Sequence, residues 1–145
     1  MKKIILLILV FSNTCFAQIS KPDFQAAMQL LQGNNPEKAL TNLENLEKKF
    51  PTDAQVIFLR GFYQFRDGNQ NGAMMSFSNA IKANPKFAMA YGGRAQLFAT
   101  KGMFDRAILD ISEAIKLEPN NADYVSTRAG FYNETKQFAL GLEDM

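Results

Sequence analysis

The chain has 145 residues, of which 47% are hydrophobic and 21% are charged, and its formal net charge is +2. This composition is typical of a globular domain and excludes the disordered, collagen-like and disulfide-rich classes. Histidine is absent and cysteine occurs once, so the chain lacks the residues for a zinc cage, a histidine general base or an internal disulfide. We therefore expect no enzymatic activity, no cofactor and no metal site.

Residues 1–17 have the pattern of a secretory signal peptide. Two lysines near the amino terminus precede an apolar run over residues 4–11 (IILLILVF), and small residues occupy positions 15 and 17. The run is shorter than the ~20 residues that a membrane-spanning helix requires. We predict cleavage after Ala17 and an exported protein, periplasmic or secreted. The alternative is a lipid anchor on Cys15, although the preceding residues, Ser12–Thr14, differ from a lipobox.

Removal of this segment would leave 128 residues, with 14 basic side chains, 14 acidic side chains and no cysteine. Nucleic acids and anionic membranes bind basic surfaces, so we expect neither partner, and no membrane insertion of the mature chain. The absence of thiols suits an oxidising, exported compartment.

A period of 34 residues organises the rest of the chain. It recurs in columns of proline, alanine and arginine: Pro51, Pro85 and Pro119; Ala39, Ala73 and Ala107; Arg60, Arg94 and Arg128. Apolar residues at helical spacing predict two antiparallel helices in each period, over residues 54–66 and 72–83, then 88–100 and 104–117. Gly68 suits a left-handed cap between the two helices, and Pro85 ends the second one.

This pattern resembles the tetratricopeptide repeat (TPR). The third unit carries the residue types of that family at Tyr91, Ala95, Phe98, Ala107, Ile111, Ala114 and Pro119. The second unit departs from the pattern at Gln64, where the family has an aromatic residue. The resemblance implies an all-α, right-handed TPR solenoid, with repeats over residues 20–53, 54–87, 88–121 and 122–145, the last of them incomplete.

The fourth unit stops at Met145, inside its second helix. Solenoids end in a polar capping helix, and without one several apolar residues would lack a neighbour: Phe131, Tyr132, Phe138, Leu140 and Leu142. Two interpretations remain. The sequence is part of a longer protein, or another chain covers this face, for example by self-association.

The arginine column occupies a position where this family often has leucine. In an antiparallel helix pair, Arg94 would lie beside Asp110 and Arg128 beside Asp144, whereas Arg60 would face Ser76. We predict a repeated ion pair that orients the two helices of a unit. The alternative is a ladder of arginines that binds an anion.

The first helix of each TPR unit lines the concave groove of the solenoid, where this sequence places a stripe of large apolar residues. Phe58, Phe62 and Phe65 advance by 4 and then 3 residues, so their side chains share one helical face. A separate apolar face of the same helix would seat it on its predecessor. We therefore predict an exposed partner-binding site. Its residues are Phe24, Met28, Phe58, Phe62 and Phe65. The alternative is that the protein's own terminal segment covers the phenylalanines.

The groove binding mode best known in this family is a Lys–Asn–Arg clamp that holds a terminal carboxylate. This chain lacks the clamp, because Phe58 and Phe62 stand where it needs Lys and Asn. The resemblance then implies an exported bacterial scaffold that binds a protein or peptide segment in its groove. The alternative is that these repeats are the docking portion of a longer envelope-assembly protein or enzyme whose remainder lies beyond residue 145.

Overall fold

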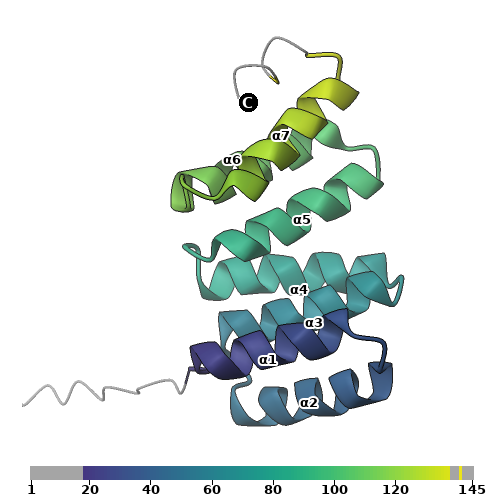
Figure 1. Ribbon diagram of the computed structural model, residues 1–145, viewed down its shortest axis with the longest axis vertical. Coiled ribbons are helices and arrows are strands. Elements are labelled where there is room, and N and C mark those ends of the chain that lie inside the picture. Colours follow the sequence, from purple (N-terminus) through teal and green to yellow (C-terminus); the bar gives the residue numbers. More distant parts are fainter. Residues whose placement is uncertain (1–17, 138–140, 142–145) are drawn as a thin grey trace, which may run out of the picture.

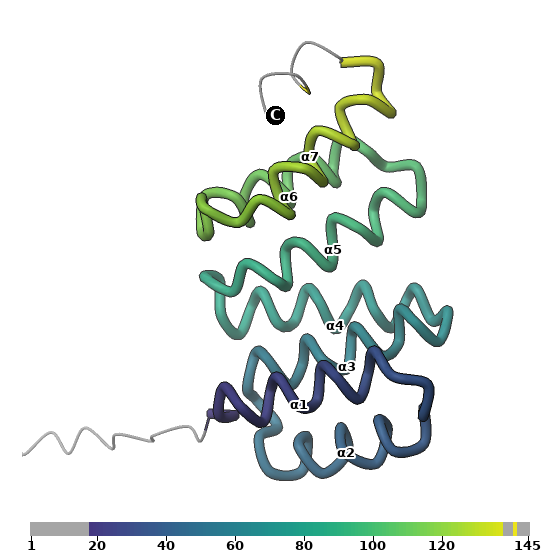
Figure 2. Tube along the Cα trace, viewed as in Figure 1, coloured from purple at the N-terminus to yellow at the C-terminus, as the bar shows by residue number. Residues whose placement is uncertain are grey.

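The computed structural model describes residues 18–137 and 141, and within them the chain forms α-helices and no strand. The helices are α1 (Lys21–Gln32), α2 (Pro36–Lys49), α3 (Ala54–Arg66), α4 (Gln70–Ala83), α5 (Ala88–Thr100), α6 (Phe104–Leu117) and α7 (Ala122–Glu134). They stack along the long axis, from α2 and α1 at one end to α6 and α7 at the other (Figure 1). The Cα trace in Figure 2 runs back and forth across this stack. The predicted all-α solenoid is confirmed.

The predicted bounds are confirmed for α3, α5 and α6. Helix α4 begins two residues earlier than predicted because the side chain of Asn69 caps it, accepting a hydrogen bond from the N–H of Gly72 at 2.9 Å. Asn35 and Asp53 cap α2 and α3 in the same way. The predicted signal peptide lies outside the described residues. None of the helices described is long and apolar enough to span a bilayer.

The turns inside the second, third and fourth units share a left-handed residue. Gly68 has φ +80° and Gly102 has φ +71°, as the position of Gly68 in the sequence predicts. Lys136, one period after Gly102, adopts the same conformation with φ 60°. This turn therefore keeps the left-handed conformation in the fourth unit, where lysine replaces glycine, but not in the first unit, which has Asn34 at the equivalent position.

Small residues let the helices approach closely. Ala73, Ala80, Ala107 and Ala114 are all fully buried, where α3 packs on α4 and α5 packs on α6. The buried apolar side chains divide into two clusters. The first joins α1–α4 to one side of α5, and the second joins the other side of α5 to α6 and α7.

At the carboxyl end, the expectation that Phe131 would lack a neighbour is wrong. Its side chain is 7% exposed, and its ring centroid lies 6.2 Å from that of Phe104. Tyr132 is half-buried, with the guanidinium of Arg128 5.9 Å from its ring centroid. The remaining residues of that expectation, Phe138, Leu140 and Leu142, lie outside the described part of the chain.

Candidate partner-binding groove

The five residues predicted to bind a partner fall into two groups. Phe24 and Phe58 are buried, at 8% and 4% exposure. Met28, Phe62 and Phe65 are half-buried and pack against the first core cluster. The expectation that Phe24 and Phe58 are exposed is therefore wrong, whereas binding of a partner by Met28, Phe62 and Phe65 stays a prediction.

Phe58 is buried because aromatic rings from α1, from α4 and from the segment before α5 surround it. Its ring centroid lies 5.5 Å from that of Phe77, 5.4 Å from that of Phe87 and 6.4 Å from that of Phe24. Such separations are typical of favourable aromatic pairs. Within the described residues, these rings of α1, α4 and the segment before α5 cover Phe58.

Phe87 is the residue that sequence reasoning missed. It lies in the N-cap position of α5, which has no side-chain cap hydrogen bond. One period earlier and one period later, the same position holds the capping residues Asp53 and Asn121. The role of Phe87 is to cover Phe58. The sequence contained one indication of this role, because an aromatic residue cannot cap a helix and yet stands where the neighbouring repeats have a capping residue.

Two glycines make room for these rings. A Cβ on Gly61 would lie 2.7 Å from the ring of Phe77, and a Cβ on Gly93 would lie 3.0 Å from that ring and 3.3 Å from the ring of Phe58. Helices α3 and α5 therefore approach the aromatic cluster more closely than an alanine would allow. The cluster belongs to the core rather than to the groove.

Three residues of the predicted site remain partly accessible, namely Met28, Phe62 and Phe65, and we name them the groove patch. Phe62 stacks on the buried ring of Phe58, with centroids 6.3 Å apart and an interplanar angle of 29°. The core therefore holds this ring in place while part of it stays in contact with solvent. A half-buried aromatic residue on a rigid support is suited to anchor a ligand side chain.

Farther along the groove, a hollow of about 400 Å³ lies between α5 and α7. Its lining is Gln96, Ala99, Thr100, Phe104, Thr127, Gly130, Phe131 and Glu134. Phe104 and Phe131 supply apolar surface there, while small and polar residues make up the rest. The lining of this hollow therefore differs from the large apolar side chains of the groove patch.

The arginine column is engaged by neighbouring helices. The predicted pair of Arg94 and Asp110 is confirmed, with Nε 2.7 Å and Nη2 2.8 Å from the two carboxylate oxygens. The hydrogen bond to this carboxylate raises the pKa of Arg94 above its ordinary value. Arg94 also donates to the hydroxyl of Ser78 at 3.3 Å, so it links α5 to both α4 and α6.

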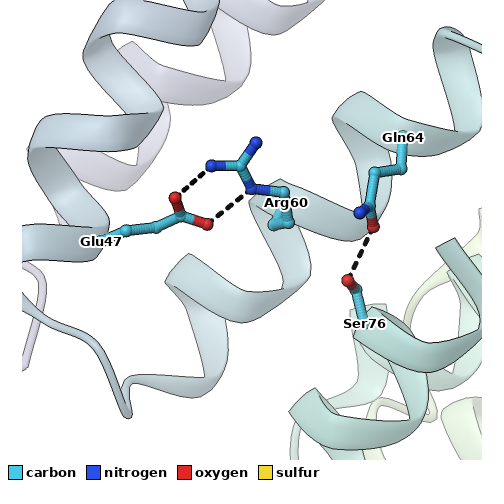
Figure 3. A network of polar contacts seen from close by, with 4 residues as sticks. All are labelled: Glu47, Arg60, Gln64 and Ser76. Atoms are coloured by element: carbon cyan, nitrogen blue, oxygen red, sulfur yellow. Dashed lines mark hydrogen bonds and ion pairs between the residues drawn. The ribbon is translucent and has the colours of Figure 1, made fainter. Parts of the chain in front are cut away.

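The expected partner of Arg60 is wrong. Arg60 pairs with Glu47 of α2, through Nε at 2.6 Å and also through Nη2 (Figure 3). This hydrogen bond raises the pKa of Arg60. Ser76 instead donates to the side chain of Gln64 at 2.7 Å. That hydrogen bond explains the glutamine at a position where the family has an aromatic residue.

The arginine side chains are long enough to reach the second helix of the preceding unit. Arg128 follows the same rule and donates to Ser112 at 3.2 Å, while its predicted partner, Asp144, lies outside the described residues. The ion pairs of Arg60 and Arg94 therefore join units as well as helices within a unit. Both guanidinium groups already bind carboxylates, which supports the structural interpretation over an anion-binding ladder.

In the part of the chain that the structure describes, no group of three or more Cys, Asp or Glu side chains is placed to hold a metal ion. The groove patch and the hollow between α5 and α7 are the surfaces that can accept a ligand, since Arg60 and Arg94 already pair with carboxylates.

No family model matches the chain. It is 30% identical over 111 residues to the UDP-N-acetylglucosamine–peptide N-acetylglucosaminyltransferase of Giardia intestinalis, which covers 77% of this chain and 7% of that protein. It is 29% identical over 103 residues to tetratricopeptide repeat protein 6 of Homo sapiens, which covers 71% of this chain and 20% of that protein. The chain thus spans no more than a fifth of the length of these curated relatives.

Solved structures have the same fold. The MamA protein superposes with a TM-score of 0.70 at 17% identity, over 84% of this chain and 67% of that one. The complex of the TPR2B domain of yeast Sti1 with pHsp70 superposes with a TM-score of 0.60 at 28% identity, over 63% of this chain and 73% of that one. The period of 34 residues, the stacked helix pairs and these similarities identify the chain as a TPR protein.

Proposed function

We propose that this protein is an exported scaffold, without enzymatic activity of its own, that binds a protein or peptide segment along its concave groove. The groove patch is the observation that carries this proposal. Met28, Phe62 and Phe65 are large apolar residues that the fold leaves half-exposed, although the same helices bury other residues of the stripe. Apolar surface of this kind commonly marks a site for a partner.

The mode of binding follows from the shape and chemistry of the groove. Apolar side chains of an amphipathic helix or an extended peptide would be buried against Phe62 and Phe65, and polar groups of the ligand would meet Gln96 and Thr127 in the hollow between α5 and α7. The yeast Sti1 domain, similar in fold, is in complex with pHsp70. Because Phe58 and Phe62 replace the carboxylate clamp, we propose that recognition depends on apolar side chains rather than on a terminal carboxylate.

A matched pair of variants tests this proposal. A ligand would first be captured from an envelope extract and identified, and its affinity then measured by titration calorimetry. Phe62→Ser should weaken binding by roughly 2 kcal/mol, about 30-fold, if Phe62 is an anchor. Met75→Ser is the control, because Met75 is 68% exposed on α4, the second helix of its unit. Equal affinities for the two variants would refute the groove as the binding site.

The export part of the proposal has its own test. Protein isolated from the envelope or periplasmic fraction of the native host should begin at Gln18, as mass spectrometry of the intact protein would show. An intact Met1 on cytoplasmic material would contradict export. An acylated Cys15 would establish lipid anchoring instead.

A second candidate function is that these repeats are the docking portion of a longer protein. The short coverage of the curated relatives, 7% and 20% of their lengths, favours this candidate, because TPR arrays of this size occur there inside much larger chains. Reading the coding region beyond codon 145 distinguishes the two. A downstream enzyme or assembly domain would establish the second candidate, and a stop codon would remove it.

A further inference from the structure

The described chain begins at a contact with the cap of α3. Ile19 is buried, and its backbone N–H donates a hydrogen bond to Oδ2 of Asp53 at 3.1 Å. The other oxygen of Asp53 accepts from the N–H groups of Gln55 at 2.7 Å and Val56 at 3.2 Å. Among the described residues, no lysine or arginine forms an ion pair with Asp53. This half-buried carboxylate is thus satisfied by neutral donors alone.

A hollow of about 660 Å³ lies beside this contact. Its lining is Gln18, Ile19, Thr52, Asp53, Ala54, Gln55, Ala83 and Asn84. Asp53 is the single ionisable side chain of that lining. The positive amino end of α3 meets Oδ1 of Asp53, which caps that helix, and offsets part of its charge. Helix α4 ends at Ala83, and the negative end of its dipole adds to the charge that remains on Asp53. The hollow is therefore suited to hold a cation.

We propose that this hollow is the binding site, here called the seat, of the α-ammonium group of Gln18. Cleavage after Ala17 would create that group. The backbone nitrogens of Gln18 and Ile19 are separated by at most ~3.6 Å, which places the nitrogen of Gln18 within about 7 Å of Oδ2 of Asp53. In an uncleaved chain this nitrogen is a neutral amide. After cleavage it is a cation within about 7 Å of the Asp53 carboxylate, so processing adds a favourable charge interaction to the fold.

The consequence is that proteolytic maturation stabilises the repeats directly, by electrostatics at their first residue. This inference rests on the cleavage site of the proposed function, but the seat itself is tested on purified protein that begins at Gln18. An ion pair near the surface is worth little in general. Here the N–H of Ile19 already holds Asp53 beside the chain end, so little further ordering is needed.

The experiment compares two forms of the same chain. Cyclisation of Gln18, in which its α-nitrogen attacks the side-chain carboxamide and ammonia leaves, removes the positive charge. The ammonium form should melt about 1–4 °C above the cyclised form at pH 6. In Asp53→Asn the difference should vanish, because asparagine caps a helix as well as aspartate but carries no charge.

Asp23→Asn is the matched control. Asp23 is an exposed carboxylate near the same end of the chain that does not line the hollow, so its loss should leave the difference unchanged. An α-amino group ordinarily has a pKa of about 7.7–8.0. The advantage of the ammonium form is therefore full at pH 6 and is lost as the α-ammonium group deprotonates at higher pH.

Equal melting temperatures of the two forms would overturn the seat, as would a difference that survives in Asp53→Asn. A native protein that begins at a residue other than Gln18 would overturn the link to maturation, through the export proposal, whatever the melting experiment shows. Binding of a ligand to the groove is measured separately and tests neither point.

Discussion

Arg94 of α5 donates two hydrogen bonds to the carboxylate of Asp110 on α6, one from Nε at 2.7 Å and one from Nη2 at 2.8 Å. Asp110 is 7% exposed and is the one charged residue that is buried among those described. A buried ion is tolerated when its partner and its hydrogen bonds compensate the loss of water. This pair therefore stabilises the contact of α5 with α6 only while both members are present, because either charge alone would be left uncompensated.

The first prediction removes that carboxylate. Asp110→Ala should lower the free energy of unfolding by about 2–4 kcal/mol, because it leaves the Arg94 guanidinium without its partner. Glu113→Ala is the control on the same helix, since Glu113 pairs with Lys116 in solvent and should matter by less than about 0.5 kcal/mol. Urea titration of both variants measures the difference. Similar losses would show that the pair of Arg94 and Asp110 has no special role.

The second prediction concerns the glycines of the helices. Gly61→Ala should destabilise the protein by about 1–3 kcal/mol, because the new Cβ would lie 2.7 Å from the ring of Phe77. Gly130→Ala should stabilise it by about 0.5–1 kcal/mol, since that position faces open space inside a helix. Opposite signs in thermal unfolding are the expected outcome, and two changes of the same sign would contradict it.

The third prediction divides the phenylalanine stripe. Phe58→Ala should cost about 3–5 kcal/mol of stability, because Phe58 is 4% exposed and four other phenylalanine rings surround it. Phe65→Ala should cost clearly less, since Phe65 is half-buried. Denaturant titration of the two variants tests the ranking. If Phe65→Ala were as harmful as Phe58→Ala, the groove patch would be core as well.

The fourth prediction uses the left-handed turn. Lys136 has φ 60°, a conformation that costs a residue with a side chain about 1–2 kcal/mol. Lys136→Gly should therefore raise stability, by about 0.5–1 kcal/mol once the greater freedom of glycine in the unfolded chain is counted. Gly102→Lys places lysine at the equivalent turn and should have the opposite effect. Melting temperatures that move in the same direction would show that the backbone conformation does not control these turns.

The fifth prediction is a dependence on pH. Burial, with smaller contributions from Glu118 and Asp123, raises the pKa of Tyr124 to about 12 from an ordinary 10. The folded state thus keeps a proton that the unfolded chain loses, so stability is full below pH 10 and falls as pH rises from 10 to 12. Tyr124→Phe should lose less stability than the original protein over that interval. Parallel losses in the two proteins would contradict the raised pKa.

Periodicity was sufficient to predict the helices of the second and third units and the turns between them, because each depends on residues close in the chain. The positions of Gly68 and Pro85 alone delimit α4 to within a few residues. The burial of Phe58 could not be predicted in this way. It depends on Phe24 and Phe87, which reach it from a different unit and from a loop, so the helical face of Phe58 alone does not reveal them.

The arginine column shows the same limit. Spacing within one unit correctly paired Arg94 with Asp110, because the two positions lie side by side in an antiparallel helix pair. The same rule failed for Arg60, whose partner Glu47 belongs to the preceding unit. Each arginine lies near two positions where a carboxylate can pair with it, one before it and one after it in the chain. The pairing depends on which of the two positions holds an acidic residue.

Helix α5 divides its two faces between the two core clusters. Ala90 and Leu97 belong to the first, and Ala88 and Ala95 belong to the second. In a linear array each unit is stabilised mainly by its neighbours. The two halves of the array therefore unfold together only if the element that they share stays folded. Here that element is α5, which carries Gly92 and Gly93 and therefore has low intrinsic helicity. Amide protons on α1–α4 and on α6–α7 should exchange as two separate groups once α5 opens, which makes this helix the point where the array divides.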